Sequence, residues 1–291
     1  MSLSEFTACT VCGSNKIPEL NGYEAAYLCK CSNCSFVFAK KIPSEGELIA
    51  HYETYPRTNT ISAITIKRYN ELLDSLEKFR KSNNLIDVGC GDGFFLETAK
   101  QRNWNVYGTE YTDHALKICK DKGIHMHQGK LDANNYAPDF FDVITSFEVI
   151  EHINNPREEL QQFSKILRTG GAVYVTTPNF NSVSRFTLKN KWNVIEYPEH
   201  LSYYTQKTLS YLFRSANFSI DSFQTTGISL SRFQKSIGQA TTSKPTGVSK
   251  DEELRNKTET KLFYKLAKKL LNTMLTMLRA GDTLKGMFIK K

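Results

Sequence analysis

The sequence of 291 residues lacks any apolar run of about 18 residues, which argues against a transmembrane helix. Its first residues also lack the basic and apolar regions of a secretory signal peptide. We therefore expect a cytoplasmic protein whose seven cysteines are metal ligands or free thiols rather than disulfides. An apolar fraction of 40% with 23% charged residues is ordinary for a globular α/β core with an appendage.

The charge balance is basic, with a formal net charge of +8. This charge permits nucleic acid, an anionic membrane or a phosphorylated substrate as partner, and selects none of them. Nucleic acid is the less expected partner, because no basic cluster with interleaved aromatic residues occurs. Residues 259–279 predict a basic amphipathic helix, for which we favour packing against the core over peripheral membrane contact.

Four cysteines are spaced as two metal-binding knuckles. Cys9 and Cys12 are separated from Cys31 and Cys34 by 18 residues, inside the four-cysteine zinc pattern. Because thiolates fill all four positions, we expect a structural Zn²⁺ site, with Cys29 as a packing residue or a spare thiol. Residues 1–40 are thus predicted to form a zinc ribbon, which either covers the substrate or stabilises a small appendage.

The remainder alternates strands with helices, which predicts a doubly wound, Rossmann-like α/β domain. We expect strands at 85–88, 106–110, 124–127, 142–147, 172–177 and 218–225, and helices at 93–102, 113–122, from Pro156 to Gly170-Gly171, and at 205–216. A seventh strand at 284–289 is expected antiparallel at the sheet edge. The predicted division is a ribbon at 1–40, a helical linker or lid at 41–83, and a domain at 84–291 with a helical insertion at about 229–280.

A glycine turn follows the first of these strands, at Gly89, Gly91 and Gly93. The third glycine comes two positions after the second, not the three of a dinucleotide site, and no Lys-Ser/Thr pair follows to make a P-loop. Glycines let backbone amides approach a ligand, and the next helix offers free N–H groups to a carboxylate. Glu110 ends the following strand, where its carboxylate can accept from both hydroxyls of a ribose. The unit predicts a nucleoside pocket.

This spacing resembles motif I of class I S-adenosylmethionine (SAM)-dependent methyltransferases. Residues 84–226 also resemble bacterial methyltransferases of sugar and cell-surface glycan pathways, through the segments 146–153 with Pro156, 167–171, 177–179 and 197–204. The resemblance implies SAM as cofactor, held by Asp87, Gly89, Gly91, Gly93, Glu110, Tyr111, Leu131, Asp132, Phe147 and Glu148. The ribbon followed by Tyr52 and Tyr55 resembles the zinc-bearing members, which implies substrate contacts at both tyrosines.

Tyr197-Pro198-Glu199-His200 resembles the Tyr-x-Glu-His segment of deoxysugar C-methyltransferases, in which the histidine is a base supported by tyrosine and glutamate. The resemblance implies catalytic roles for His200, Glu199 and Tyr197, and a near-neutral histidine pKa suits proton removal. Since we do not expect the second α/β domain of those enzymes in this sequence, O-methylation is at least as well supported as C-methylation. A capping or packing role is the alternative for His200.

Two further residues are candidates. His152 follows the fourth predicted strand, where ligands meet a doubly wound sheet, so it is either a second base or a brace for its loop. Trp192 lies in a basic loop before His200, where it either stacks on a substrate ring or anchors the loop.

We therefore expect a SAM-dependent methyltransferase that acts on a sugar, nucleotide-sugar or cell-surface glycan intermediate. An rRNA or tRNA methyltransferase whose zinc ribbon recognises RNA is one alternative, and a non-catalytic SAM- or partner-binding module is another. The sequence indicates neither the acceptor atom nor the oligomeric state.

Overall fold

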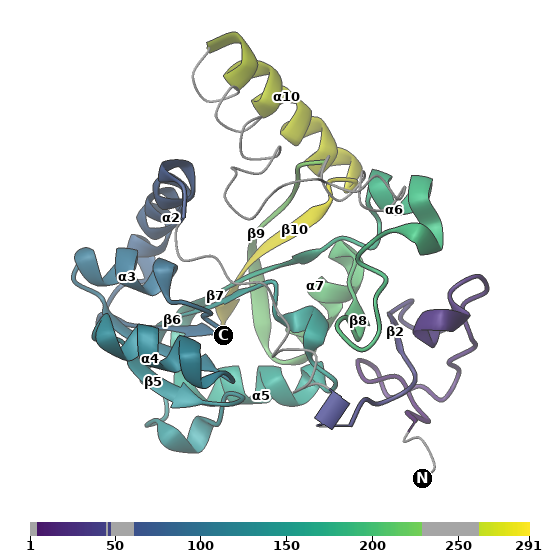
Figure 1. The fold of residues 1–291 in the computed structure, drawn as a ribbon, viewed down its shortest axis with the longest axis horizontal. Helices are drawn as coiled ribbons and strands as arrows, with labels where there is room; N and C mark the ends of the chain where they lie inside the picture. Colours follow the sequence, from purple (N-terminus) through teal and green to yellow (C-terminus); the bar gives the residue numbers. More distant parts are fainter. Residues whose placement is uncertain (1–4, 45, 48–60, 229–261) are drawn as a thin grey trace.

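The computed structural model describes residues 5–44, 46–47, 61–228 and 262–291 (Figure 1). Its centre is a seven-stranded sheet with the order β5-β4-β3-β6-β7-β10-β9. The strands are β3 (Asn84–Val88), β4 (Asn105–Glu110), β5 (His125–Gln128), β6 (Phe141–Phe147), β7 (Leu167–Pro178), β9 (Phe218–Thr226) and β10 (Thr283–Lys290). Strands β3 to β7 pair in parallel, and β10 pairs antiparallel with β7 and β9. The predicted fold class is confirmed.

Helices cover both faces of the sheet. The helices in the described parts of the chain are α2 (Ala63–Leu76), α3 (Phe94–Gln101), α4 (Asp113–Asp121), α5 (Pro156–Ile166), α6 (Val183–Leu188), α7 (Gln206–Ser215) and α10 (Leu262–Leu278). Leu85 and Ile86 are neighbours on β3 and point to opposite faces. Leu85 packs in a cluster with α2, α3 and α4, whereas Ile86 packs in a cluster with α5 and α7. This alternation explains why the segment is an uninterrupted apolar run.

Strand β10 is antiparallel, as expected, but the prediction that it lies at the sheet edge is wrong. It lies between β7 and β9, and β9 forms the edge. Burial gives the physical reason: Leu284 and Phe288 of β10 are both 0% exposed, whereas β9 is buried at only two of its nine positions.

The predicted helix from Pro156 to Gly170-Gly171 is also too long. Helix α5 ends at Ile166, and Leu167 already belongs to β7, paired with Phe141 of β6. Leu167 is fully buried in the sheet, which favours its extended conformation over another helical turn.

The N-terminal segment forms a second, three-stranded sheet of β1 (Leu28–Lys30), β2 (Val37–Ala39) and β8 (Ser202–Tyr203). Strand β8 comes from the part of the chain that also forms the seven-stranded sheet, and it pairs with β2. The aromatic rings of Phe36 and Tyr204 lie 5.1 Å apart in the same core cluster. The packing is therefore continuous across residue 40, and the domain boundary expected there stays a prediction.

Helix α10 does not pack its apolar face on the core, contrary to the favoured expectation. Among its side chains that the structure describes, Leu275 alone is buried. No helix in the described parts of the chain has the length and apolarity needed to span a bilayer.

Candidate functional site

The glycine loop after β3 has the geometry of a ligand cradle. Gly89 and Gly91 have φ angles of +70° and +53°, which favour glycine. A Cβ at Gly89 would lie 2.6 Å from Val149 Cγ2, whereas a Cβ at Gly91 would meet nothing within 4 Å. The loop thus packs closely on one side and leaves space beside Gly91. Gly93 caps α3 without a side-chain hydrogen bond, so the first amides of the helix lack a capping side chain.

Glu110 lies against this loop, at the carboxyl end of β4. Its carboxylate accepts hydrogen bonds from the backbone amides of Gly91 (3.1 Å) and Tyr111 (2.9 Å). A carboxylate has about four acceptor sites, so these two bonds leave capacity for a ribose diol. Tyr111 is 54% exposed beside it. The structure brings together the predicted glycine turn and the predicted acid.

Asp87 lies below the loop rather than in open space. It is buried and accepts a hydrogen bond of 2.7 Å from Thr145 Oγ1 on the neighbouring strand β6. Burial, together with the nearby Glu110, raises the pKa of Asp87 to about 8, although the bond from Thr145 lowers it. Its hydrogen bond with Thr145 is therefore structural, and any role toward a cofactor stays a prediction.

The remaining predicted cofactor residues differ in exposure. Phe147 packs against Phe95 with ring centroids 5.0 Å apart, and the amide of Glu148 donates to Thr176 O. Leu131 is 2% exposed in the core, so it can offer a ligand only its main chain. Asp132 is exposed and caps the 3₁₀ turn Ala133–Asn135.

Tyr69 of α2 is a neighbour that the sequence did not single out. Its ring lies 5.3 Å from Phe95 and 6.2 Å from Phe147, and burial raises its pKa to about 12. The signal was its helical spacing to Leu72, Leu73 and Leu76, which follow it by three, four and seven residues. Tyr52 and Tyr55, the predicted substrate contacts, lie outside the described residues.

His152 and His200 come together although 47 residues separate them in the chain. Their ring centroids are 4.9 Å apart. The Nδ1 atom of His152 lies 2.6 Å from the carbonyl oxygen of Glu199, and that of His200 lies 2.7 Å from the carbonyl oxygen of Val194. Since a carbonyl only accepts, each neutral ring carries its proton on Nδ1 and its lone pair on Nε2. Burial lowers the pKa of His152, although the Glu199 carbonyl opposes this, so the neutral form is favoured.

Glu151 completes this group, which we call the histidine cluster (Glu151, His152 and His200). One side-chain donor or acceptor atom of each residue lies within 4.8 Å of the others. The Glu151 carboxylate is buried and accepts a bond of 2.9 Å from Thr177 Oγ1. A buried carboxylate beside two imidazoles favours an imidazolium when one ring takes up a proton. The sequence predicted Glu199 for this support; its main-chain carbonyl lies against His152 Nδ1, and although burial lowers the pKa of His152, both that carbonyl and the charge of Glu199 act to raise it.

Tyr197 faces the N-terminal segment. Its ring lies 5.0 Å from that of Tyr27, and Lys41 Nζ lies 4.8 Å from its centroid. Trp192 is 1% exposed in a core cluster with Phe180 and Tyr203. Its ring therefore has no open face for a substrate, which contradicts the stacking role and agrees with the anchoring alternative.

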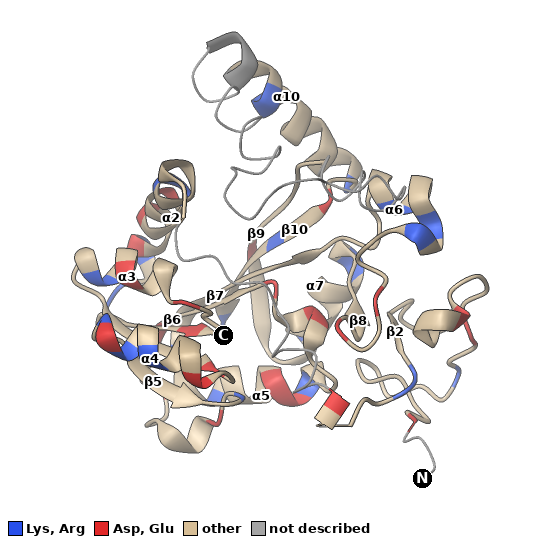
Figure 2. Cartoon of the chain, in the orientation of Figure 1, with Lys and Arg blue, Asp and Glu red and all other residues tan. Residues whose placement is uncertain are grey.

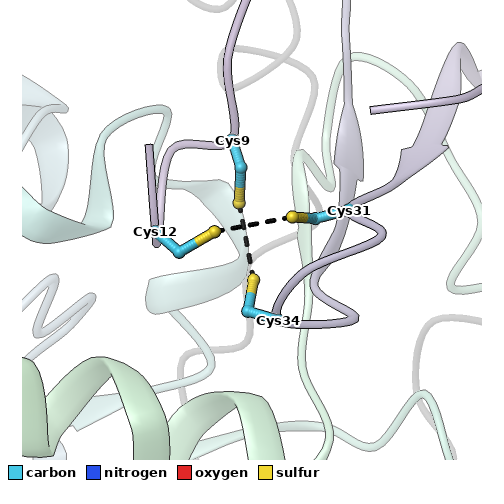
Figure 3. A group of neighbouring side chains, drawn as sticks. All are labelled: Cys9, Cys12, Cys31 and Cys34. Carbon is cyan, nitrogen blue, oxygen red and sulfur yellow. Dashed lines mark hydrogen bonds between the residues drawn. The ribbon is translucent and has the colours of Figure 1, made fainter. Parts of the chain in front are cut away.

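The four cysteines converge as the spacing predicts (Figure 3). The Sγ atoms of Cys9 and Cys34 are 3.6 Å apart, those of Cys12 and Cys31 are 3.5 Å apart, and all four lie within 4.8 Å of one another. Sulfurs at about 2.3 Å from a tetrahedral Zn²⁺ would be about 3.8 Å apart, so the cluster fits a closed zinc site. Cys29 stays outside it and donates to the Phe38 carbonyl.

Residues 62–222 match the family described as "Methyltransferase domain". The match covers more than half of the chain, so the chain belongs to this family. With the fold described above, the chain contains a class I SAM-dependent methyltransferase domain.

Among curated relatives, the chain resembles the ubiquinone biosynthesis O-methyltransferase of Nitrosomonas europaea, with 29% identity over 131 residues, 43% of this chain and 54% of the relative. The enzyme of the same name from Azoarcus sp. is 32% identical over 104 residues, 33% of this chain and 45% of the relative. The chain thus spans about half the length of these relatives.

Two solved structures share the fold. A SAM-dependent methyltransferase from Archaeoglobus fulgidus has a TM-score of 0.52 at 16% identity and covers 85% of this chain and 100% of its own. A putative sarcosine dimethylglycine methyltransferase from Galdieria sulphuraria has a TM-score of 0.53 at 14% identity and covers 78% of this chain and 85% of its own. At such identities the likeness shows the fold alone.

Proposed function

We propose that this enzyme methylates a hydroxyl oxygen of a sugar, nucleotide-sugar or glycan intermediate, with His200 as general base. The carrying observation is the pairing of His152 and His200, each with Nδ1 against a backbone carbonyl. An imidazole held in this tautomer presents its basic Nε2 atom to an acceptor. Methyl transfer needs a positioned nucleophile and a site for its proton, which this geometry supplies.

The cofactor pocket of the proposal is the glycine loop with Glu110. Bound SAM would supply a methyl group made electrophilic by a sulfonium. The space beside Gly91 admits a ligand, the Glu110 carboxylate suits its ribose, and the uncapped start of α3 suits its carboxylate. In this arrangement Asp87 joins β3 to β6 beneath the loop.

The proton passes to His200 Nε2 when the acceptor hydroxyl becomes a nucleophile. Glu151 then stabilises the imidazolium electrostatically, because it lies within 4.8 Å in the histidine cluster. His152, which burial keeps neutral, leaves the positive charge on its neighbour. We infer that Tyr197 and Lys41 hold the loop of His200 rather than touch the acceptor.

Two acceptor classes have support. The segment Tyr197–His200 resembles that of sugar-modifying enzymes and supports a carbohydrate hydroxyl. The names of the curated relatives support a second candidate, a phenolic hydroxyl of a quinone precursor, although the matches cover about half of those enzymes. In either case oxygen is the nucleophile and His200 has the same task.

The experiment combines His200→Asn with labelled SAM. Asparagine keeps a side-chain N–H near the Val194 carbonyl but removes the base, so turnover should fall by roughly 10²- to 10⁴-fold while SAM affinity stays within about twofold. The matched control is His114→Asn at an exposed position of α4, which should retain full activity. Wild-type turnover by His200→Asn would remove the general-base role.

The acceptor class is read from the fraction of cell extract that takes up labelled methyl. Label in nucleotide-sugars or glycan polymer supports the proposal, and label in solvent-extracted phenols supports the second candidate. Label in RNA would contradict both and favour the RNA methyltransferase alternative.

A further inference from the structure

Helix α10 is attached to the body of the protein through its polar side. Asn272 Oδ1 accepts from the amide of Gly227 at 3.0 Å, and Thr276 Oγ1 donates to the carbonyl of Thr225 at 3.0 Å. Leu275 lies between Asn272 and Thr276 in the sequence, on the attached side of the helix, and it is the one of these three residues that is buried. A surface helix ordinarily packs its apolar side inward, so this attachment is inverted.

The apolar side of α10 consequently faces outward. Its exposed large side chains are Leu266 (58%), Leu270 (64%), Leu271 (47%), Met274 (52%), Met277 (77%) and Leu278 (69%). At about 100° per residue, all six fall within an arc of about 140° on the helix surface. Figure 1 shows α10 projecting away from the central sheet. We call this arc the α10 stripe; such a continuous exposed apolar surface marks an interaction site.

The charges around the α10 stripe have one sign. Lys268 and Lys269 lie about 60° beyond its two borders on the helical wheel, and Leu262–Leu278 contains no acidic residue. Lysines at the border of an apolar face can extend their ammonium groups to a polar interface while their stems cover apolar surface.

Helix α6, like α10, combines basic side chains with an exposed apolar side chain. It lies beside the end of α10, because the amide of Val183 donates to Ala280 O at 3.0 Å. Phe186 is 57% exposed, and Arg185 and Lys189 line with it a hollow of about 380 Å³. Figure 2 shows basic residues on α6 and its following turn, where the sequence Val183–Lys191 contains no acid.

We propose that the α10 stripe and α6 dock the enzyme onto the surface of an anionic lipid bilayer. An apolar face bordered by lysines matches the two layers of such a surface, acyl chains beneath anionic headgroups. A second copy fits less well, since facing α10 helices would bring lysines together with no acidic partner on either helix. The helix lies in the plane of the interface and leaves the histidine cluster to act independently.

The test is co-sedimentation of the full chain with vesicles of phosphatidylcholine, with and without phosphatidylglycerol. Binding should require phosphatidylglycerol and weaken as salt is raised. The double variant Lys268→Gln/Lys269→Gln should lower the partition constant by about fivefold per lysine. Leu270→Glu/Met277→Glu should reduce sedimentation to the level of vesicle-free protein, because both side chains would enter the acyl region.

The matched control is Tyr211→Glu on α7, another exposed apolar side chain (45%), which should bind like the wild type. Apart from the half-buried Lys268, the variants alter exposed side chains, so SAM affinity should be unchanged, and thermal unfolding checks that each variant is folded. Failure of the wild type to bind anionic vesicles overturns the proposal. So does equal loss in the Tyr211→Glu control, or a wild-type dimer in solution that Leu270→Glu/Met277→Glu converts to monomer, since a second copy would then occupy the stripe.

Discussion

Replacing Glu110 by glutamine gives a sharp test of the cofactor pocket. In the structure this carboxylate already accepts from the amides of Gly91 and Tyr111, so it lies where the loop would meet a ribose. Hydrogen bonds to a charged acceptor contribute about 1.5–3 kcal/mol each, but glutamine retains one accepting oxygen. We therefore expect a net loss of about 1–3 kcal/mol of SAM binding, an increase in Kd of about 5- to 150-fold.

Isothermal titration calorimetry with SAM and with S-adenosylhomocysteine measures this loss directly. The two ligands should be affected alike, because they share the ribose and differ at sulfur. Asp121→Asn, at an exposed position at the end of α4, is the matched control and should leave both affinities unchanged. Thermal unfolding of each variant separates loss of ligand contacts from loss of loop structure.

The reasoning fails if Glu110→Gln binds both ligands with wild-type affinity. It also fails if the loss appears with SAM alone, since the discrimination would then arise at the methyl group rather than at the ribose. In either case the space beside Gly91 would need another ligand.

Two further predictions concern the metal site and a buried acid. The purified protein should contain about one zinc per chain by mass spectrometry. Cys31→Ser should lose the zinc, whereas Cys29→Ser should retain it, because Cys29 lies outside the cluster. Equal zinc content in both variants would refute the assignment. Burial raises the pKa of Glu159 to about 7, so the folded state retains this proton above the unfolded pKa and loses stability as pH rises through 7. In urea unfolding, Glu159→Gln should raise the free energy of unfolding by about 3 kcal/mol at pH 8 and by little at pH 5. The control Glu158→Gln, at an exposed neighbouring position, should leave it unchanged. A stabilisation that does not depend on pH would show that the raised pKa of Glu159 is not its cause.

The parts of the fold that local pattern determines were predictable. The alternation of apolar runs and amphipathic segments predicted the parallel strands and their helices, and the end of β3 at the glycines was evident. The position of β10 was not, because strand order depends on pairing between segments distant in the chain. Leu167 shows the same limit: an apolar residue after a helix fits another turn or a new strand, and its partner Phe141 decided between them.

The candidate site shows the same difference between features set by local sequence pattern and features set by contacts between distant segments. Gly91 and Glu110 were predictable because successive βα units place them at adjacent strand ends. The meeting of His152 with His200 was not, since it depends on how the loop after β7 folds back. The sequence left two roles open for Trp192, because a basic loop fits both a substrate contact and an anchor, and the burial of its ring in a core cluster agrees with the anchor.

The N-terminal sheet and the histidine cluster are joined by the residue that follows His200. The amide of Ala39 on β2 donates to the carbonyl of Leu201 at 2.8 Å, and the amide of Leu201 donates to the carbonyl of Glu151 at 2.8 Å. Leu201 thus bridges the sheet of the cysteine segment to the 3₁₀ turn of His152. Because this bridge adjoins His200 and not the glycine loop, we expect a displacement of β2 to alter the separation of the two imidazoles more than the glycine loop. Disturbing the N-terminal segment should therefore lower turnover more than SAM affinity.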